Sequence, residues 1–433
     1  MNEASPINVG ASNLAEPAFI PVSRSDIIAG LLHPDLWESQ SQSALASDVL
    51  HKMGLLRQYR SSLLLNELSE IYDPFNPDDE TVNVTEASDM ERLEKRRIMN
   101  AKLRELVTSA NYRELSQQDL EDVLTQASPD GVHVEVDFRE YEVRLMFYRG
   151  ESQTALKKRD IRKLFLRHLH YEVPTFERLF LAVKFKPEEE RIQEIMREEQ
   201  VDEDKARKRL KKLRRMLPPS FSTDRIYIKV FKDIPRYDVE MLFPNIRVKM
   251  KYSDKLQLGG SAVVGTLTWA IGTGTKLLVA VAISPLVLAG ALITGVGGIM
   301  YAQIRNVFIT RDKYRMLLAQ RLYFQNLANN QGALALMIDE AEEEDVKEEA
   351  LLYIHLLQTP VHYTQIDAVR TRINAFLSNR FGIEVHFDVN DALGRLMSLG
   401  LVQQTANGDL RAIPLEHANQ NLRTIWQRLC DRR

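Results

Sequence analysis

A chain of 433 residues is longer than one small domain, and at about 150 residues a domain it predicts two or three units. With 44% hydrophobic and 27% charged residues the chain is globular, and 57 basic against 60 acidic residues exclude a global charge that attracts nucleic acid. The single cysteine, Cys430, excludes an internal disulfide framework and a structural zinc site built on cysteines.

The first part of the chain predicts a leader followed by helices. Residues 1–18 are polar and lack the basic start and apolar stretch of a secretory signal, so we expect a disordered leader. A short helix is predicted within residues 19–32. Apolar residues recur at helical spacing over residues 44–72 and form one stripe over residues 86–109, which predicts two longer helices.

From residue 132 the apolar spacing changes to every second residue, which is typical of strands. The predicted strands cover residues 132–138, 141–147, 178–186, 225–232 and 245–252. The first two are adjacent in the chain, so we expect them to pair as a hairpin. Helices and strands together predict an α+β domain over residues 19–255.

A charged helical segment, residues 187–217, is inserted between two of these strands, acidic in its first half and basic in its second. The basic candidates are Lys205, Arg207, Lys208, Arg209, Lys211, Lys212, Arg214 and Arg215. They are candidate lipid-facing residues, because anionic headgroups bind a basic cluster with about 1 kcal/mol per residue. Nucleic-acid phosphates are a second possible ligand. We favour a simpler interpretation, in which a solvated helix or helical hairpin neutralises its own charge.

The most distinctive segment is the apolar block at residues 256–304, in which Lys276 is the only charged residue. Its length allows two crossings of a membrane core that is ~30 Å thick, at about 20 residues each. The block therefore predicts a two-helix transmembrane hairpin. A buried hairpin inside a large soluble core is the alternative, which the absence of charge disfavours.

The turn of this hairpin is expected at Ser284-Pro285, because proline disfavours helix at the residue before it and begins the next helix well. The spans then lie near residues 261–283 and 286–304. A turn at residues 272–275 would leave a short first span and an overlong second one.

Basic residues flank the block at both ends. They are Arg247, Lys249, Lys251 and Lys255 before it, and Arg305, Arg311, Lys313 and Arg315 after it. Such flanks stay on the cytoplasmic side, so we expect an integral protein of the plasma or thylakoid membrane with both termini cytoplasmic. Lys276 is a candidate intramembrane site, although we favour snorkelling of its ammonium to the far interface.

After the block, residues 305–345 predict a long helix and an acidic segment, and residues 346–414 predict a winged-helix-like domain. Its three helices are expected at residues 347–358, 364–379 and 389–399. Its wing is a hairpin that turns at Asn407-Gly408, the sequence pair typical of tight hairpin turns. Residues 415–433 form a C-terminal helix or tail.

Winged helices often bind DNA, but the third helix here presents an unfavourable charge. Asp388, Asn390 and Asp391 accompany a single Arg395 on its candidate recognition face. Such a face would repel phosphate, so we expect contact with protein and do not expect nucleic acid as a partner.

No pattern of catalytic residues is present. The chain lacks the nucleophile elbow, the zinc-protease helix and the dinucleotide-binding fingerprint. His168 and His170 have acidic neighbours, but two histidines do not make a metal site. We therefore predict no enzyme, no catalytic residue, no metal and no cofactor.

Three segments resemble one known family. They are FIPVSRSDIIAGLL at residues 19–32, FKDIPRYDVEMLFPNIRVKMKYSDKLQLGG at residues 231–260, and RDKYRMLLAQRLYFQNLANNQGALALMIDEAEEEDVKEE at residues 311–349. Together with the apolar block they resemble the transmembrane-protein-143-like family of uncharacterised two-pass membrane proteins. The resemblance implies a two-pass membrane protein with no assigned activity, and the absence of a transit peptide suggests a cyanobacterial member.

The sequence thus predicts an α+β membrane protein with an N-terminal α+β domain, a transmembrane hairpin, and a C-terminal helical region with a winged-helix-like domain. We expect a membrane-anchored scaffold or regulatory protein that contacts the lipid bilayer and either a protein partner or a second copy. One alternative is an oligomeric channel or transporter built from the hairpins, with Lys276 lining its path. The other is a membrane-tethered DNA-binding regulator.

Overall fold

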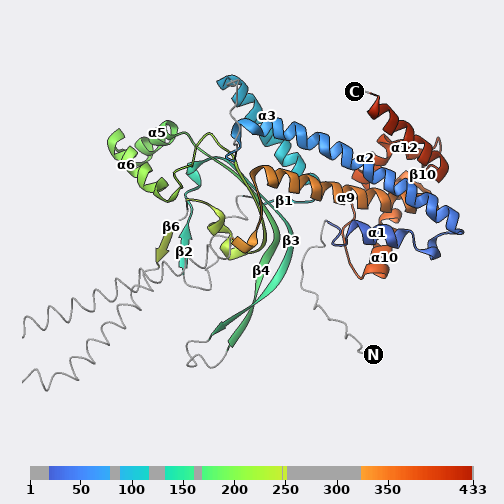
Figure 1. Cartoon of the computed structure of the whole chain (residues 1–433). Coiled ribbons are helices and arrows are strands. Elements are labelled where there is room, and N and C mark those ends of the chain that lie inside the picture. The colour runs from blue at the N-terminus through green and yellow to red at the C-terminus, as the bar shows by residue number, and fades with distance from the viewer. Residues whose placement is uncertain are drawn as a thin grey trace, which may run out of the picture.

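The computed structural model describes residues 19–78, 88–116, 132–159, 168–245, 247–250 and 323–431. Figure 1 shows a twisted sheet with long helices packed against it, a pair of short helices at one end, and a second group of helices near the far end of α2. The described fold is mixed α/β.

The first three helices form where the sequence predicts them. They are α1 (Arg24–Leu31), α2 (Gln40–Tyr72) and α3 (Asp89–Ser109). The helix α2 begins four residues earlier than predicted, because the Ser39 side chain accepts a hydrogen bond from the backbone N–H of Gln42. Ser88 and Glu91 form a reciprocal capping box at the start of α3.

The main sheet is antiparallel, with strand order β1-β3-β4-β5-β7. Its strands are β1 (Arg113–Glu114), β3 (Tyr141–Arg159), β4 (His168–Phe185), β5 (Tyr227–Pro235) and β7 (Asn326–Asn329). The β3–β4 ladder runs from Tyr141 opposite Phe185 to Arg159 opposite His168, whereas β5 pairs with β4 only over residues 175–183. The outer part of β3 and β4 therefore leaves the sheet as a two-stranded ribbon (Figure 1).

The predicted hairpin between residues 132–138 and 141–147 is wrong. The strand β2 (Val132–Glu135) pairs instead with β6 (Arg247–Met250) in a separate two-stranded sheet. Between β2 and β3 the chain passes through the 3-10 turn η3 (Phe138–Glu140), which leads it from one sheet into the other. The partner of β3 is β4, in which the consecutive residues Leu179, Phe180, Leu181 and Ala182 are all buried, so both faces of the strand are covered there.

The alternating side chains of the main sheet enter two cores. On one face, residues of β3, β4 and β5 pack against α2, α3 and the helix α9 (Asn330–Gln358), with Leu145, Phe147, Phe180, Ala182, Val230, Leu68, Leu103, Leu334 and Met337 in this core. On the other face, β3, β4 and β5 pack against the 3-10 segment η6 (Arg236–Leu242) and Phe243, with Met146, Leu179, Leu181, Phe231, Val239 and Leu242 in the core.

The chain turns from β7 into α9 at Asn330, whose φ of 48° lies in the left-handed region that asparagine tolerates. The Asn330 side chain accepts a hydrogen bond from the backbone N–H of Ile228 at 3.0 Å. Its amide donates to Asp78 at 2.6 Å. These bonds fasten the start of α9 to β5 and to the chain that follows α2.

The charged segment folds into two short helices, α5 (Glu188–Glu199) and α6 (Glu203–Leu213), followed by the 3-10 turn η5 (Arg214–Met216). We call α5, α6 and their connection the charged hairpin. It has a small apolar core of its own, made of Ile192, Ile195, Ala206 and Leu210.

The C-terminal part joins a three-stranded sheet to three helices. Its elements are β8 (Val361–His362), α10 (Ile366–Phe381), α11 (Val389–Ser398), β9 (Val402–Gln404), β10 (Asp409–Ala412) and α12 (Leu415–Cys430), with strand order β8-β10-β9. Gly408 has a φ of 86° at the expected turn between β9 and β10. The helix α9 runs without a break across residue 345, where the sequence predicted a boundary.

The remaining short 3-10 turns are η1 (Pro34–Leu36), η2 (Asp73–Phe75) and η7 (Tyr363–Gln365).

The helices of the described residues correct the prediction of a membrane protein. Among the residues that the structure describes, no helix is both long and apolar enough to span a bilayer. The long helices α2 and α9 carry charged residues along their length, and α9 buries several of them in ion pairs. This finding contradicts the predicted α+β membrane fold class, the two-pass topology and the localisation in the plasma or thylakoid membrane. The block at residues 256–304, its two spans and Lys276 lie outside the described residues.

Candidate functional site

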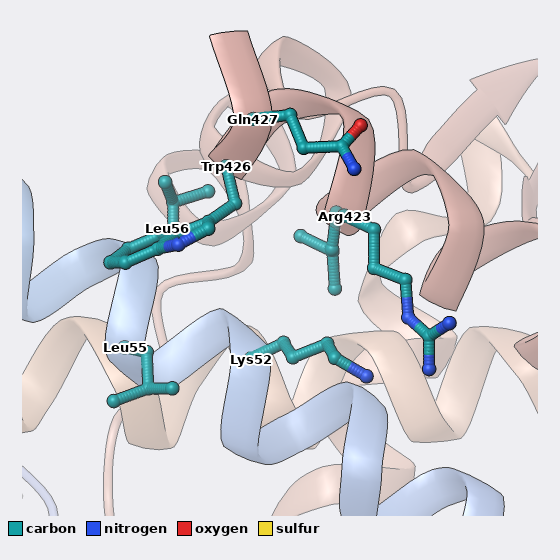
Figure 2. A pocket seen from close by; sticks show the side chains of 7 residues that line it. Lys52, Leu55, Leu56, Arg423, Trp426 and Gln427 are labelled. Atoms are coloured by element: carbon teal, nitrogen blue, oxygen red, sulfur yellow. The ribbon is translucent and has the colours of Figure 1, made fainter. Parts of the chain in front are cut away.

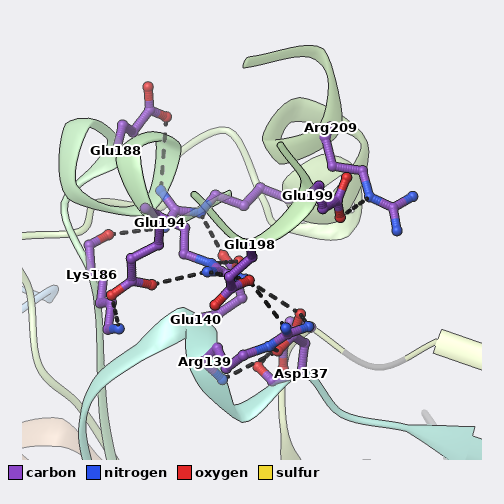
Figure 3. Close-up of polar contacts among 12 residues, drawn as sticks. Asp137, Arg139, Glu140, Lys186, Glu188, Glu194, Glu198, Glu199 and Arg209 are labelled. Carbon is purple, nitrogen blue, oxygen red and sulfur yellow. Dashed lines mark hydrogen bonds and ion pairs between the residues drawn. The ribbon is translucent and has the colours of Figure 1, made fainter. Parts of the chain in front are cut away.

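The charged hairpin is fastened to the main sheet by a buried arginine. Arg191 of α5 is 1% exposed, and its Nε donates to Oε1 of Glu140 at 2.7 Å. Three more carboxylates surround the same guanidinium, from Glu194 at 2.9 Å, Glu198 at 3.5 Å and Asp137 at 3.6 Å. Figure 3 draws this cluster between the charged hairpin and the η3 turn.

A second arginine completes the attachment. Arg214 donates from Nε to Oε2 of Glu140 at 3.1 Å and from Nη2 to the carbonyl oxygen of Lys186 at 2.8 Å. Each oxygen of the buried Glu140 carboxylate thus accepts from a different guanidinium. We call Arg191, Arg214 and Glu140 the arginine clamp.

The guanidinium of Arg191 keeps its charge although it is buried. Burial by itself would lower the pKa of Arg191, but the hydrogen bond to Glu140 and the neighbouring carboxylates outweigh it and raise that pKa. A buried ion pair of this kind contributes less net stability than its contacts suggest, but loss of one partner leaves an uncompensated buried charge. The clamp therefore fixes the orientation of the charged hairpin on the sheet.

The eight basic candidate residues are divided by this arrangement. Arg214 belongs to the clamp and is not a surface residue. Three others form ion pairs within the hairpin, Lys205 with Asp202 at 3.2 Å, Arg207 with Glu203 at 2.9 Å and Arg209 with Glu199 at 3.4 Å. The acidic half thus neutralises part of the basic half, as the favoured interpretation of the sequence predicts.

The other four, Lys208, Lys211, Lys212 and Arg215, are exposed. Their spacing of i, i+3, i+4 and i+7 places them along one side of α6 and its 3-10 extension. Within the described part of the chain, none of the four forms an ion pair or a side-chain hydrogen bond. We call them the basic face, and at 1.5 Å per helical residue it is ~10 Å long.

The sequence analysis did not distinguish the arginines of the clamp from the residues of the basic face, although their spacing from apolar residues distinguishes them. Arg191 lies four residues before Ile195, and Arg214 lies four residues after Leu210, so each arginine shares a helix side with a residue of the apolar core. None of the four residues of the basic face lies four residues from a residue of this core.

A second group of buried charges joins α9 to its neighbours. Asp345, Glu348 and Glu349 of α9 form ion pairs with Arg395 of α11 at 3.1, 2.5 and 3.1 Å. Arg57 of α2 contacts Asp345 at 3.3 Å and also pairs with Glu349. We call these three acids and two arginines the α9 carboxylate cluster. Arg395 was expected on the surface of a recognition helix, but it points inward instead.

The carboxylates in this cluster outnumber the guanidiniums, and burial affects their titration. Burial raises the pKa of Glu348 to about 7, against the opposing attraction of Arg395. It also raises the pKa values of Asp345 and Glu349, which both arginines oppose. Glu348 is therefore a group that changes its charge near neutral pH inside the fold.

Stability should fall as pH rises through this range. In the folded state Glu348 has a pKa of about 7, above the ordinary value of 4.5, so the folded protein holds a proton that the unfolded chain releases. The stabilisation is complete below about pH 4.5 and is lost by about pH 7, a decrease of about 3 kcal/mol. We expect Glu348→Gln to flatten this slope in urea unfolding measured at about pH 5 and about pH 8.

The matched control is Glu384→Gln, which removes a carboxylate from an exposed position. It should leave the pH dependence of the unfolding free energy unchanged. Parallel curves for the wild-type protein and the Glu348→Gln variant would show that Glu348 does not titrate inside the fold.

The other residues considered from the sequence add no second site. His168 and His170 lie opposite Arg159 and Lys157 in the β3–β4 ribbon. Among the described residues, no three histidine, cysteine or acidic side chains are grouped so that they could hold a metal ion. Cys430 is exposed at the end of α12.

Comparison with known proteins gives one family match. A family model described as "Protein of unknown function (DUF3754)" matches residues 176–332. No solved structure matches the chain. The matched segment contains the charged hairpin with its basic face and the two arginines of the clamp, whereas the α9 carboxylate cluster lies outside it.

Proposed function

We propose that the protein is a scaffold or regulatory protein whose basic face binds an acidic segment of a partner protein. The observation that carries this proposal is the group of four exposed cations, Lys208, Lys211, Lys212 and Arg215, which have no ion-pair partner among the described residues. Like charges gathered on one side of a helix repel one another, and a ligand of opposite charge relieves that repulsion.

The dimensions of the basic face suit a short acidic segment. A face ~10 Å long matches two turns of a helix that carries Asp or Glu every three or four residues. Exposed ion pairs contribute about 0.2–1 kcal/mol each, so four pairs supply roughly 1–4 kcal/mol. Such binding is weak, sensitive to salt and readily reversible, which suits a regulatory contact.

Neighbouring acidic residues make nucleic acid a poorer ligand. A hydrogen bond to Glu203 raises the pKa of Arg207, and Glu188 and Glu189 of α5 contribute to the same shift. These carboxylates are therefore close to the basic half of the hairpin. A duplex carries one phosphate charge per ~1.7 Å of its length and would extend past the basic face into this acidic region.

The arginine clamp supports the proposal by holding the basic face in one orientation. Because Arg191 and Arg214 bind the same carboxylate from two ends of the charged hairpin, α5 and α6 cannot rotate freely on the sheet. A preorganised surface loses less conformational freedom when it binds a partner.

The two alternatives drawn from the sequence have less support. A channel built from hairpins depends on the predicted membrane spans, and no helix among the described residues is long and apolar enough to be one. A DNA-binding role for α11 depends on Arg395, which is bound to three carboxylates of α9.

The test measures binding of a fluorescently labelled oligoglutamate peptide to the full chain by anisotropy at increasing salt. We expect binding that weakens with salt. Substitution of Lys208, Lys211, Lys212 and Arg215 by glutamine should reduce the affinity by about tenfold or more, as expected for the loss of about 1.4 kcal/mol or more.

The matched control removes the same charge from scattered positions. Arg97, Arg380, Arg411 and Arg428 are exposed and form no ion pair in the described ranges, so their combined substitution by glutamine lowers the net charge equally. This variant should keep its affinity within about twofold. Equal losses in both variants, or tighter binding of duplex DNA or of anionic vesicles than of oligoglutamate, would contradict the proposal.

A further inference from the structure

A second, unrelated feature lies at the other end of the molecule, where α12 packs along α2. A cavity of about 270 Å³ opens between the two helices. Figure 2 shows its lining, made of Lys52, Leu55, Leu56, Leu422, Arg423, Trp426 and Gln427. Leu55 and Trp426 remain 41% and 40% exposed, so large apolar side chains are left open to solvent beside the cavity.

A second cavity is lined by the same tryptophan. It has a volume of about 370 Å³ and is lined by Tyr59, Trp426, Leu429 and Cys430, so the two cavities share the indole ring. The rings of Tyr59 and Trp426 meet edge to face, with centroids 5.8 Å apart. Together the two cavities have the size of a small-molecule pocket, which spans roughly 300–1,000 Å³ in proteins. We call them the α2–α12 groove.

One end of the groove carries positive charge. The Lys52 ammonium is held by Asp48 and by Oδ1 of Asn419 at 2.8 Å. The Arg423 guanidinium extends toward the same side of the cavity as Lys52 (Figure 2), and it has no ion-pair partner in the part of the chain that the structure describes. The pKa of Asp48 is lowered mainly by Lys52, with a smaller effect of Arg423. Two cations against one carboxylate leave this end with a charge of +1.

We propose that the α2–α12 groove binds a medium-chain aliphatic carboxylate. The single net positive charge fits one carboxylate at Arg423. The apolar chain then lies against Leu55 and Leu56 and passes the indole of Trp426 toward Tyr59 and Cys430. Burial of the chain supplies the affinity, and the guanidinium selects a carboxylate over other head groups.

The experiment titrates the full chain with decanoate, below the concentration at which it forms micelles, and records tryptophan fluorescence. We expect a saturable change that the Trp426→Phe variant lacks, because Trp426 lines both cavities and Trp37, the other tryptophan among the described residues, lines neither. Decanol and decylammonium have the same chain without the carboxylate, and should bind about tenfold more weakly.

A charge variant tests the role of Arg423. Arg423→Gln should weaken decanoate binding about tenfold and leave decanol binding unchanged. Arg428→Gln is the matched control, because Arg428 is an exposed residue of the same helix that does not line the groove. Urea unfolding of each variant establishes that the fold is retained.

The single cysteine gives a second measurement that needs no substitution. Cys430 is exposed at the far end of the groove, so bound decanoate should slow its reaction with a thiol reagent. Three outcomes overturn the proposal: no saturable signal by either method, equal binding of the three decyl compounds, or a fluorescence spectrum that changes with protein concentration alone. The last would identify the groove as a contact between two copies.

Discussion

Replacement of Arg191 by methionine should lower the free energy of unfolding by about 3–5 kcal/mol. Methionine fills much of the same space but leaves the buried Glu140 with Arg214 as its one ion-pair partner among the described residues. Glu194 and Asp137 lose the same guanidinium. Urea unfolding of the full chain measures the loss, which should shrink at low pH as the abandoned carboxylates take up protons.

Two further variants make this result specific. Arg197→Met is the matched control on α5, since Arg197 is exposed and donates only to the carbonyl oxygen of Gln193, so its cost should stay below about 0.5 kcal/mol. The double variant Arg191→Met with Glu140→Gln should recover part of the loss, because it removes the unpaired charge. A double variant no more stable than Arg191→Met would show that packing, not charge, explains the effect.

Replacement of Arg395 by methionine, in the α9 carboxylate cluster, should also lower the free energy of unfolding by about 3–5 kcal/mol. Asp345 and Glu349 would then keep Arg57 as an ion-pair partner, whereas Glu348 would keep no arginine partner among the described residues. The loss should be larger at about pH 8 than at about pH 5, because removal of Arg395 raises the pKa of Glu348 further and deprotonation then costs more.

The control for this variant is Arg380→Met on α10. Arg380 is exposed and makes no ion pair in the regions described, so its removal should change the unfolding free energy by less than about 0.5 kcal/mol at either pH. An Arg395→Met variant whose loss is the same at both pH values would refute the assignment of the α9 carboxylate cluster as the origin.

The helix α9 connects these two regions of the molecule. Its first half packs on the sheet through Leu334 and Met337, and its second half packs through Leu351 and Leu352 among α1, α2 and the C-terminal helices. A change at the α9 carboxylate cluster therefore acts between the two cores. This position fits the proposed regulatory role, because a protonation step there can alter how firmly the C-terminal helices are held.

The sequence by itself determined the local elements. The helix predicted at residues 389–399 is α11, and Asp388 caps it by accepting from the backbone N–H of Asn390. The turn at Asn407-Gly408 forms as expected, with Gly408 in the left-handed region. These features depend on hydrogen bonds and backbone preferences within a few residues, so the neighbouring residues in the sequence suffice to predict them.

Strand partners required the tertiary structure. Alternating apolar residues indicated strands at residues 132–138 and 141–147, but the pattern is the same for any partner. The first strand pairs with residues 247–250, which are far away in the sequence, and the second pairs with the strand that follows it, residues 168–185. Pairing is decided by which strands bury complementary faces, and a single strand does not contain that information.

The association of the two chain ends was also decided only in three dimensions. The sequence placed residues 19–255 and 346–414 in different domains, yet Ile27 and Leu31 of α1 share one core with Leu351 of α9 and Leu396 of α11. Each segment has an apolar side, and composition does not say which other side will cover it.

The same limit applies to the charged residues. Arg214 and Arg215 are adjacent and chemically identical, but the fold buries the first against Glu140 and leaves the second on the basic face. Arg395 was expected at the surface and lies among three carboxylates. Sequence determines that a side chain is charged, whereas its burial and its partners, which set its pKa and its availability to a ligand, depend on surfaces that meet only in the folded chain.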